Sequence, residues 1–169
     1  LKYQLVYLVM TRAALPDLHH NAPATEAFWE LFTAHTYSLG VYSPADARTM
    51  LERMAARRGI ALDERVAQRA LEQSGRHPGL LRAAFWALQE TPALLEPDAT
   101  LLAVPSVAAE CGKLWQHCGP EEQHYAYILA AGLPLQDTAA PALGRLRLAG
   151  LVRGTPPALF APLFSAYVL

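Results

Sequence analysis

The spacing of apolar and polar residues changes near residue 43. Lys2–Met10 is apolar at nearly every position, which is typical of a strand buried on both faces of a parallel sheet. Thr36–Tyr42 is a second candidate strand, and Thr25 can cap a short helix between the two. Because two strands cannot form a stable parallel sheet alone, we expect residues 1–43 to be the last part of a larger α/β core, with more chain before Leu1.

A helical period follows. Ser43 is a favoured N-cap residue, and Gly59 suits the C-terminal end of the helix that Ser43 begins. Asp63 can cap a second helix, and Pro78 can occupy the first turn of a third. Short connections join the three helices. The pattern therefore predicts a compact helical unit over residues 44–90.

The rest of the chain predicts a linker and a second small unit. Residues 91–105 contain three prolines and little periodicity, which is typical of a linker. Three helices, a β-hairpin and a terminal helix are predicted after it. Their predicted starts or spans are Ser106, Pro120, Asp137 or Thr138, strands 151–153 and 158–160, and Pro162. Three helices followed by a hairpin is the order of elements in a winged helix.

Composition restricts the partners of the chain. The 169 residues carry a net charge of −1 with a pI near 6.6, whereas nucleic-acid-binding domains usually exceed a pI of about 9. No run reaches the ~18 apolar residues of a membrane span, so no membrane partner is predicted. Cys111 and Cys118 would lie ~10 Å apart on a helix, too far for a disulfide. They are expected to be core residues of a protein in the reducing cytoplasm.

The sequence offers no catalytic motif of its own. There is no GxxxxGK[ST] phosphate loop, no GxSxG elbow and no HExxH pair. The glycines are isolated at helix ends, so nothing cradles the phosphates of a nucleotide. The histidines and cysteines match no zinc spacing. We therefore expect neither ATP hydrolysis by this chain alone nor a metal site.

Two short motifs carry a family resemblance. The strand Leu5–Met10 ends in Thr11 and Arg12, and it resembles the sensor-1 strand of the STAND ATPases, the NB-ARC and NACHT relatives within AAA+. Ser74–Leu81, SGRHPGLL, looks like the "GxP" or "GGHP" element of the lid in that superfamily. Arg76 stands where many members of that superfamily have a second glycine. The resemblance implies nucleotide contacts by Thr11 and Arg12, as well as by His77 and Pro78.

The C-terminal part extends the resemblance. Cys111–Leu151 is similar to the family's pattern of a Leu-Trp helix, a "PEEQ" turn and a closing "GL", and ALFAPLFSAYV resembles its wing and final helix. The implied fold is mostly α: the end of an α/β P-loop core (1–43), a helical lid (44–90), a linker (91–105) and a winged helix (106–169).

The resemblance also implies a function. The parent protein would be an ATP/ADP-dependent switch that uses Mg²⁺, and this chain would be its regulatory portion, with no nucleotide tightly bound by itself. Its partners would be the missing N-terminal P-loop core and another protein.

Two other functions stay open. Arg145 and Arg147 on the predicted third helix, with Arg153 on the wing, could contact DNA. Three arginines are few beside the ~6–10 phosphate contacts of strong binders, and the third helix offers mainly Ala, Gly and Pro to base edges. A protein-contact role is therefore favoured over a DNA-binding transcription regulator. A helical interaction module without any nucleotide role is the third alternative.

Overall fold

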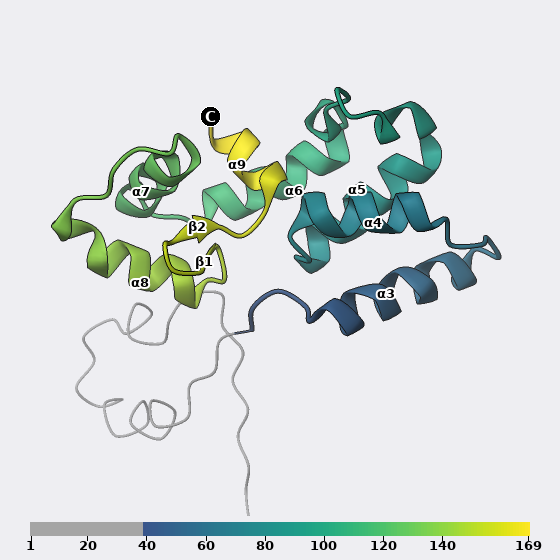
Figure 1. Ribbon diagram of the computed structural model, residues 1–169, viewed down its shortest axis with the longest axis horizontal. Helices are drawn as coiled ribbons and strands as arrows, with labels where there is room; N and C mark the ends of the chain where they lie inside the picture. The colour runs from purple at the N-terminus through teal and green to yellow at the C-terminus, as the bar shows by residue number, and fades with distance from the viewer. Residues whose placement is uncertain (1–38) are drawn as a thin grey trace, which may run out of the picture. The chain divides into compact units, whose positions relative to one another are not determined.

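The computed structural model describes residues 39–169 (Figure 1). The first predicted strand, Lys2–Met10, and the motif residues Thr11 and Arg12 lie outside the described residues. Only the end of the second predicted strand is described, and residues 39–42 are not a strand there. A strand at this position would bond to a neighbouring strand. Instead, the backbone N–H of Tyr42 donates to the carbonyl of Arg76 at 3.1 Å.

The described part is mostly α-helical, as the sequence predicts. Seven α-helices, three short 3-10 helices and one two-stranded hairpin make up residues 39–169. In chain order they are α3 (Pro44–Arg57), α4 (Glu64–Ser74), α5 (Pro78–Glu90), η2 (Pro92–Leu95), η3 (Leu101–Ala103), α6 (Pro105–Gln116), α7 (Pro120–Ala130), η4 (Asp137–Ala139), α8 (Ala140–Leu148), β1 (Val152–Arg153), β2 (Ala158–Leu159) and α9 (Pro162–Val168).

Local capping explains where the first helices begin. The Ser43 hydroxyl accepts the N–H of Asp46 at 3.1 Å, and one oxygen of Asp63 accepts the N–H groups of Arg65 and Val66 at 2.7 and 3.2 Å. These bonds satisfy donors that a helix N-terminus leaves without intrahelical partners. Gly59 follows the end of α3 at φ 65°, a left-handed conformation that suits glycine. All three predicted boundaries are confirmed.

Three boundaries in the C-terminal part differ from the prediction. Helix α6 begins at Pro105, one residue before Ser106, because proline fits the first helical position. Residues 137–139 form the 3-10 helix η4, and α8 begins only at Ala140, with Pro141 in its first turn. The hairpin strands are shorter than predicted and pair antiparallel, with Val152 opposite Leu159.

One continuous core joins the described elements. The most deeply buried helix is α5, and its Phe85, Leu81 and Leu88 have no exposed surface. Helix α5 packs on α4 and on α6, and α9 packs against α4, α6 and α7. Figure 1 shows α9 between α7 and the end formed by α4, α5 and α6. Phe160 and Phe164 are buried in this region, and their ring centroids lie 5.6 Å apart.

The predicted linker is a packed connection. Leu101 in η3 is 2% exposed, and it belongs to the same core as the helices before and after it. The guanidinium of Arg69 on α4 donates to the carbonyls of Glu96 and Ala99 at 3.2 and 3.3 Å. The connection is therefore fixed to α4 by side-chain to backbone bonds. The division into lid, linker and winged helix stays a prediction.

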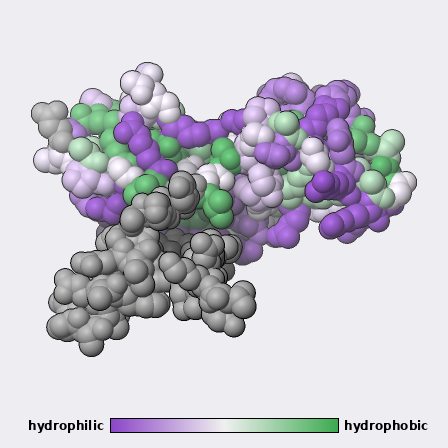
Figure 2. All heavy atoms as spheres, turned by 90° about the horizontal axis from the view of Figure 1, so that it is seen from below, coloured by the Kyte–Doolittle hydropathy of each residue, from purple (hydrophilic) through white to green (hydrophobic). Residues whose placement is uncertain are grey.

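The surface and the cysteines complete the picture. Figure 2 shows mostly hydrophilic surface toward the end of the molecule that holds α3. Cys111 and Cys118 are both free and buried, as predicted for core residues. Burial raises the pKa of the two thiols to about 12 and about 11, so both stay protonated near neutral pH.

No helix within residues 39–169 has the length and apolar character needed to cross a membrane.

Candidate functional site

The motif that resembles a lid element forms the turn between α4 and α5. Gly75 ends α4 at φ 56°, and Arg76 follows at φ 68°, so two consecutive residues are left-handed. His77 is extended and caps α5, whose first residue is Pro78. The left-handed conformation is easy for glycine but costs a residue with a Cβ about 1–2 kcal/mol. Arg76 is therefore held in place by its surroundings. We call Gly75–His77 the α4–α5 turn.

The α4–α5 turn lies directly against the segment that connects the hairpin to α9. A Cβ placed on Gly75 would overlap the carbonyl oxygen of Phe160 and lie 2.9 Å from the Cβ of Ala161. Only a residue without a side chain fits between α4 and this segment, Phe160–Ala161, which we call the β2–α9 loop. Two parts of the chain that are 85 residues apart thus touch through backbone atoms.

The side chain of His77 strengthens the same contact. Its Nδ1 accepts the N–H of Leu80 through a long bond of 3.5 Å, and its ring lies 5.7 Å from the ring of Phe160, centroid to centroid. Burial lowers the pKa of His77 more than the nearby carboxylate of Glu110 raises it. The imidazole is therefore neutral at neutral pH, and its Nδ1 is free to act as the cap.

Glu110 on α6 links the start of α5 to its own helix. A Cβ on Gly79 would lie 2.5 Å from the Oε2 of Glu110, so the carboxylate packs closely on the first turn of α5. The same carboxylate pairs with Lys113 at 2.6 Å and approaches Arg82 at 3.8 Å. Glu110 is thereby held between α5 and α6, and its negative charge is compensated.

The residues at the α4–α5 turn and the start of α5 are suited to contacting a ligand. Pro78 and His77 are both half-buried, so part of each residue stays exposed to solvent. The hydroxyl of Ser74 is fully buried and accepts the N–H of Arg76 at 3.1 Å, so it is occupied within the turn itself. Thr11 and Arg12, the other predicted nucleotide contacts, lie outside residues 39–169, so the structure does not place them beside His77 and Pro78.

The arginines predicted as DNA contacts have different surroundings. Arg145 donates to Glu121 and Glu122 on α7, each at 2.5 Å, and these two carboxylates raise the pKa of Arg145. A DNA phosphate would have to displace them. Arg147 is exposed on the last turn of α8. The half-buried guanidinium of Arg153 donates to the carbonyl of Phe160. One of the three positive charges is thus paired with carboxylates of the same chain, and a second guanidinium bonds to the backbone.

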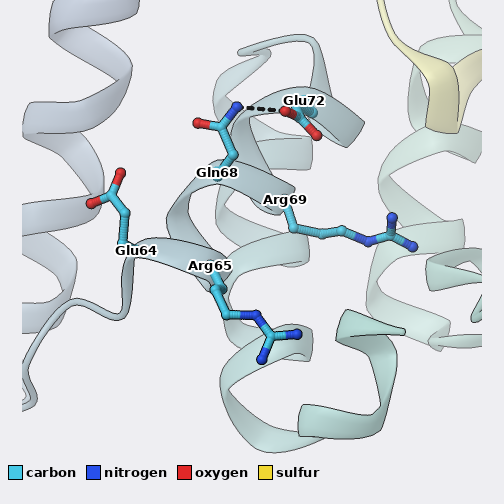
Figure 3. Close-up of a pocket in the computed structure, with 5 residues that line it drawn as sticks. All are labelled: Glu64, Arg65, Gln68, Arg69 and Glu72. Carbon is cyan, nitrogen blue, oxygen red and sulfur yellow. Dashed lines mark hydrogen bonds between the residues drawn. The ribbon is translucent and has the colours of Figure 1, made fainter. Parts of the chain in front are cut away.

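A surface hollow on α4 offers no better site. It has a volume of about 390 Å³ and is lined by one helix face: Glu64, Arg65, Gln68, Arg69 and Glu72. Figure 3 shows these side chains pointing in different directions, with Gln68 bonded to Glu72. Glu64 pairs with Arg48 at 2.7 Å on α3, and Arg69 is occupied by backbone carbonyls. The hollow is open to water, and its side chains do not converge on a ligand.

Known proteins supply no template for this site, because no family model, no curated protein and no solved structure matches the chain. The site therefore has to be interpreted from its own geometry. The sequence located His77 and Pro78 at a helix start but missed Tyr42, Glu110 and Phe160, which surround them. Nothing in the sequence near these three residues points to a partner so far along the chain.

Proposed function

We propose that residues 44–169 are the lid and winged helix of an ATP/ADP-dependent molecular switch, and that they pass the nucleotide state to a protein partner. The order of elements supports this proposal: three helices, a packed connection, then three helices and a hairpin before a terminal helix. The observation that carries it is the contact between the α4–α5 turn and the β2–α9 loop. We propose that a ligand which moves the turn also moves the start of α9.

The nucleotide would meet this chain on its base side. Pro78 and His77 are half-buried, and their exposed parts would contact the base, whereas the sequence has no loop to hold phosphates. The phosphates and Mg²⁺ would be held by the P-loop core of the parent protein, with Thr11 and Arg12 as the γ-phosphate sensor. A switch also needs contacts that differ between its two states. The Gly75–Phe160 contact is the one that we propose to differ.

The protein partner would meet exposed apolar side chains on the C-terminal part. Tyr127 on α7 is 46% exposed, and Leu133 just after it is 50% exposed. Large apolar side chains at an exposed helix end are common in protein interfaces, where aromatic residues are enriched. A DNA-binding role has weaker support, because Arg145 is already paired with two carboxylates.

The first test is on the natively expressed protein. Peptide-mapping mass spectrometry should find a GxxxxGK[ST] peptide that precedes Leu1. ADP affinity is then measured by calorimetry for the wild type, Arg12→Ala and Pro78→Ala. We expect each variant to bind at least about tenfold more weakly, a loss of about 1.4 kcal/mol.

Pro92→Ala is the matched control, since Pro92 also opens a helical turn but lies in the connection to α6. Its ADP affinity should equal that of the wild type. A native protein without a phosphate loop, or one whose ADP affinity is unchanged by Pro78→Ala, would refute the proposal.

A further inference from the structure

Two arginines from distant parts of the chain lie near one backbone carbonyl, that of Phe160. The guanidinium of Arg153, on β1, donates to the carbonyl oxygen of Phe160. The Cα of Gly75 is so close to that oxygen that no Cβ fits between them. Arg76 follows Gly75 directly, and consecutive Cα atoms are about 3.8 Å apart. The α4–α5 turn and the hairpin therefore bring Arg76 and Arg153 to the same small region.

The positive charge of this pair is not compensated by any carboxylate in the described residues. Within residues 39–169 the ion pairs involve Arg48, Arg82, Lys113 and Arg145, whereas Arg76 and Arg153 have none. Burial and the nearby charge of Arg76 lower the pKa of Arg153, which agrees with their closeness. Both side chains are half-buried, so water and salt screen their repulsion less than at the open surface.

The backbone at Arg76 adds a second observation. Its φ of 68° is left-handed, and the preceding Gly75 is left-handed as well. Strained residues with a Cβ persist where the surroundings fix them, and they are concentrated at ligand sites. Here the N–H of Tyr42 donates to the carbonyl of Arg76 at 3.1 Å, which helps to fix the backbone that carries the Arg76 side chain.

We propose that Arg76 and Arg153 form a binding site for a doubly charged oxyanion, phosphate or the phosphoryl group of a larger ligand, where the α4–α5 turn meets the β-hairpin. Two planar guanidinium groups suit such an anion, because each can donate two parallel hydrogen bonds to its oxygens. A bound anion removes the repulsion between the two arginines and ties the turn to the hairpin. This site requires no phosphate loop, so it is independent of the nucleotide switch proposed above.

Thermal unfolding of the 169-residue chain tests this site. Inorganic phosphate is titrated against chloride at constant ionic strength. Binding to the folded state should raise Tm by several degrees along a saturating curve. Exclusion of phosphate from the protein surface also raises Tm, but without saturation and in every variant alike. The saturating part therefore reports the site.

Three variants make the test specific. Arg76→Gly suits the left-handed backbone and keeps the fold, so it should unfold at a higher temperature without phosphate and lose the saturating shift. Arg153→Gln keeps a donor near Phe160 and should lose the shift as well. Arg57→Gln removes one exposed charge at the end of α3 and should keep it.

A comparison with ADP completes the experiment. ADP is titrated in parallel with phosphate. A response to ADP at concentrations tenfold lower than those of phosphate would identify a nucleotide as the source of the phosphoryl group, and equal responses would identify phosphate itself. A wild-type response without saturation, or a saturating response that survives in Arg76→Gly, would overturn the proposal.

Discussion

Two turns between helices use the same local conformation in opposite surroundings. Gly75 after α4 and Gly132 after α7 are both left-handed, with φ values of 56° and 65°. A Cβ on Gly75 would collide with the β2–α9 loop, whereas a Cβ on Gly132 would meet nothing within 4 Å. Glycine after a helix thus identifies a turn and says nothing about contacts. The contact at Gly75 is tertiary, and it is what makes that turn a candidate for transmitting a signal.

Replacing each of the two glycines with alanine should give the largest difference between the two turns. Gly75→Ala should lower the free energy of unfolding by about 3–4 kcal/mol, because the methyl group meets backbone atoms that cannot move away cheaply. Gly132→Ala should cost only the left-handed penalty of about 1 kcal/mol. Urea unfolding of both variants measures the difference. Equal losses would show that the contact with the β2–α9 loop is not tight.

Removing the side chain of His77 in the α4–α5 turn tests the same comparison in a second way. His77→Ala loses the cap of α5 and the packing against Phe160, and we expect a loss of about 2 kcal/mol. His117→Ala, at the exposed end of α6, should change stability by less than about 0.5 kcal/mol. The same urea assay compares them. A His77→Ala protein as stable as His117→Ala would contradict the contact with Phe160.

Relaxing the backbone gives a smaller effect of opposite sign. Arg76→Gly removes the strain of a left-handed residue with a Cβ and should raise the free energy of unfolding by about 1 kcal/mol. Arg147→Gly, in the regular helix α8, should lower it by about the same amount. Thermal and urea unfolding without phosphate measure both. Destabilisation by Arg76→Gly would mean that the side chain contributes more than its backbone costs.

The pH dependence is the smallest expected effect. Since the pKa of His77 is lower in the folded protein, the unfolded chain binds a proton first as the pH falls below about 6.5. The stability that neutral His77 contributes is therefore complete above that pH and is lost as the pH falls through the folded pKa. His77→Gln should flatten this part of the curve of unfolding free energy against pH, and His117→Gln should not. Identical slopes in the two variants would contradict burial of His77.

Local elements were predictable from the sequence because their causes are local. Ser43, Asp63 and Pro78 begin helices through bonds or ring geometry within a few residues, and the structure confirms each one. The connection 91–105 could not be predicted as packed, because η3, which holds Leu101, packs on α9 as well as on the neighbouring α6, and α9 lies at the other end of the described chain. The same reason applies to the end of the strand predicted at 36–42, where Tyr42 bonds to Arg76.

The residues of the candidate site also divide into those that the sequence identified and those that it did not. His77 and Pro78 were visible as a motif at a helix start, and their position on that helix is confirmed. Phe160 and Glu110 were not visible as parts of a site, since Phe160 reaches the α4–α5 turn, and Glu110 the first turn of α5, only after the chain has folded. The nucleotide contacts predicted for these residues, and for Thr11 and Arg12, stay predictions.

Hydrogen exchange on the intact natively expressed protein tests the central claim most directly. The backbone amides of residues 160–168 are compared with ADP bound and with a non-hydrolysable ATP analogue bound. If the α4–α5 turn transmits the nucleotide state, these amides should exchange at least about tenfold faster in one state, a difference of about 1.4 kcal/mol in local opening. Equal exchange in the two states, with nucleotide bound in both, would contradict the claim.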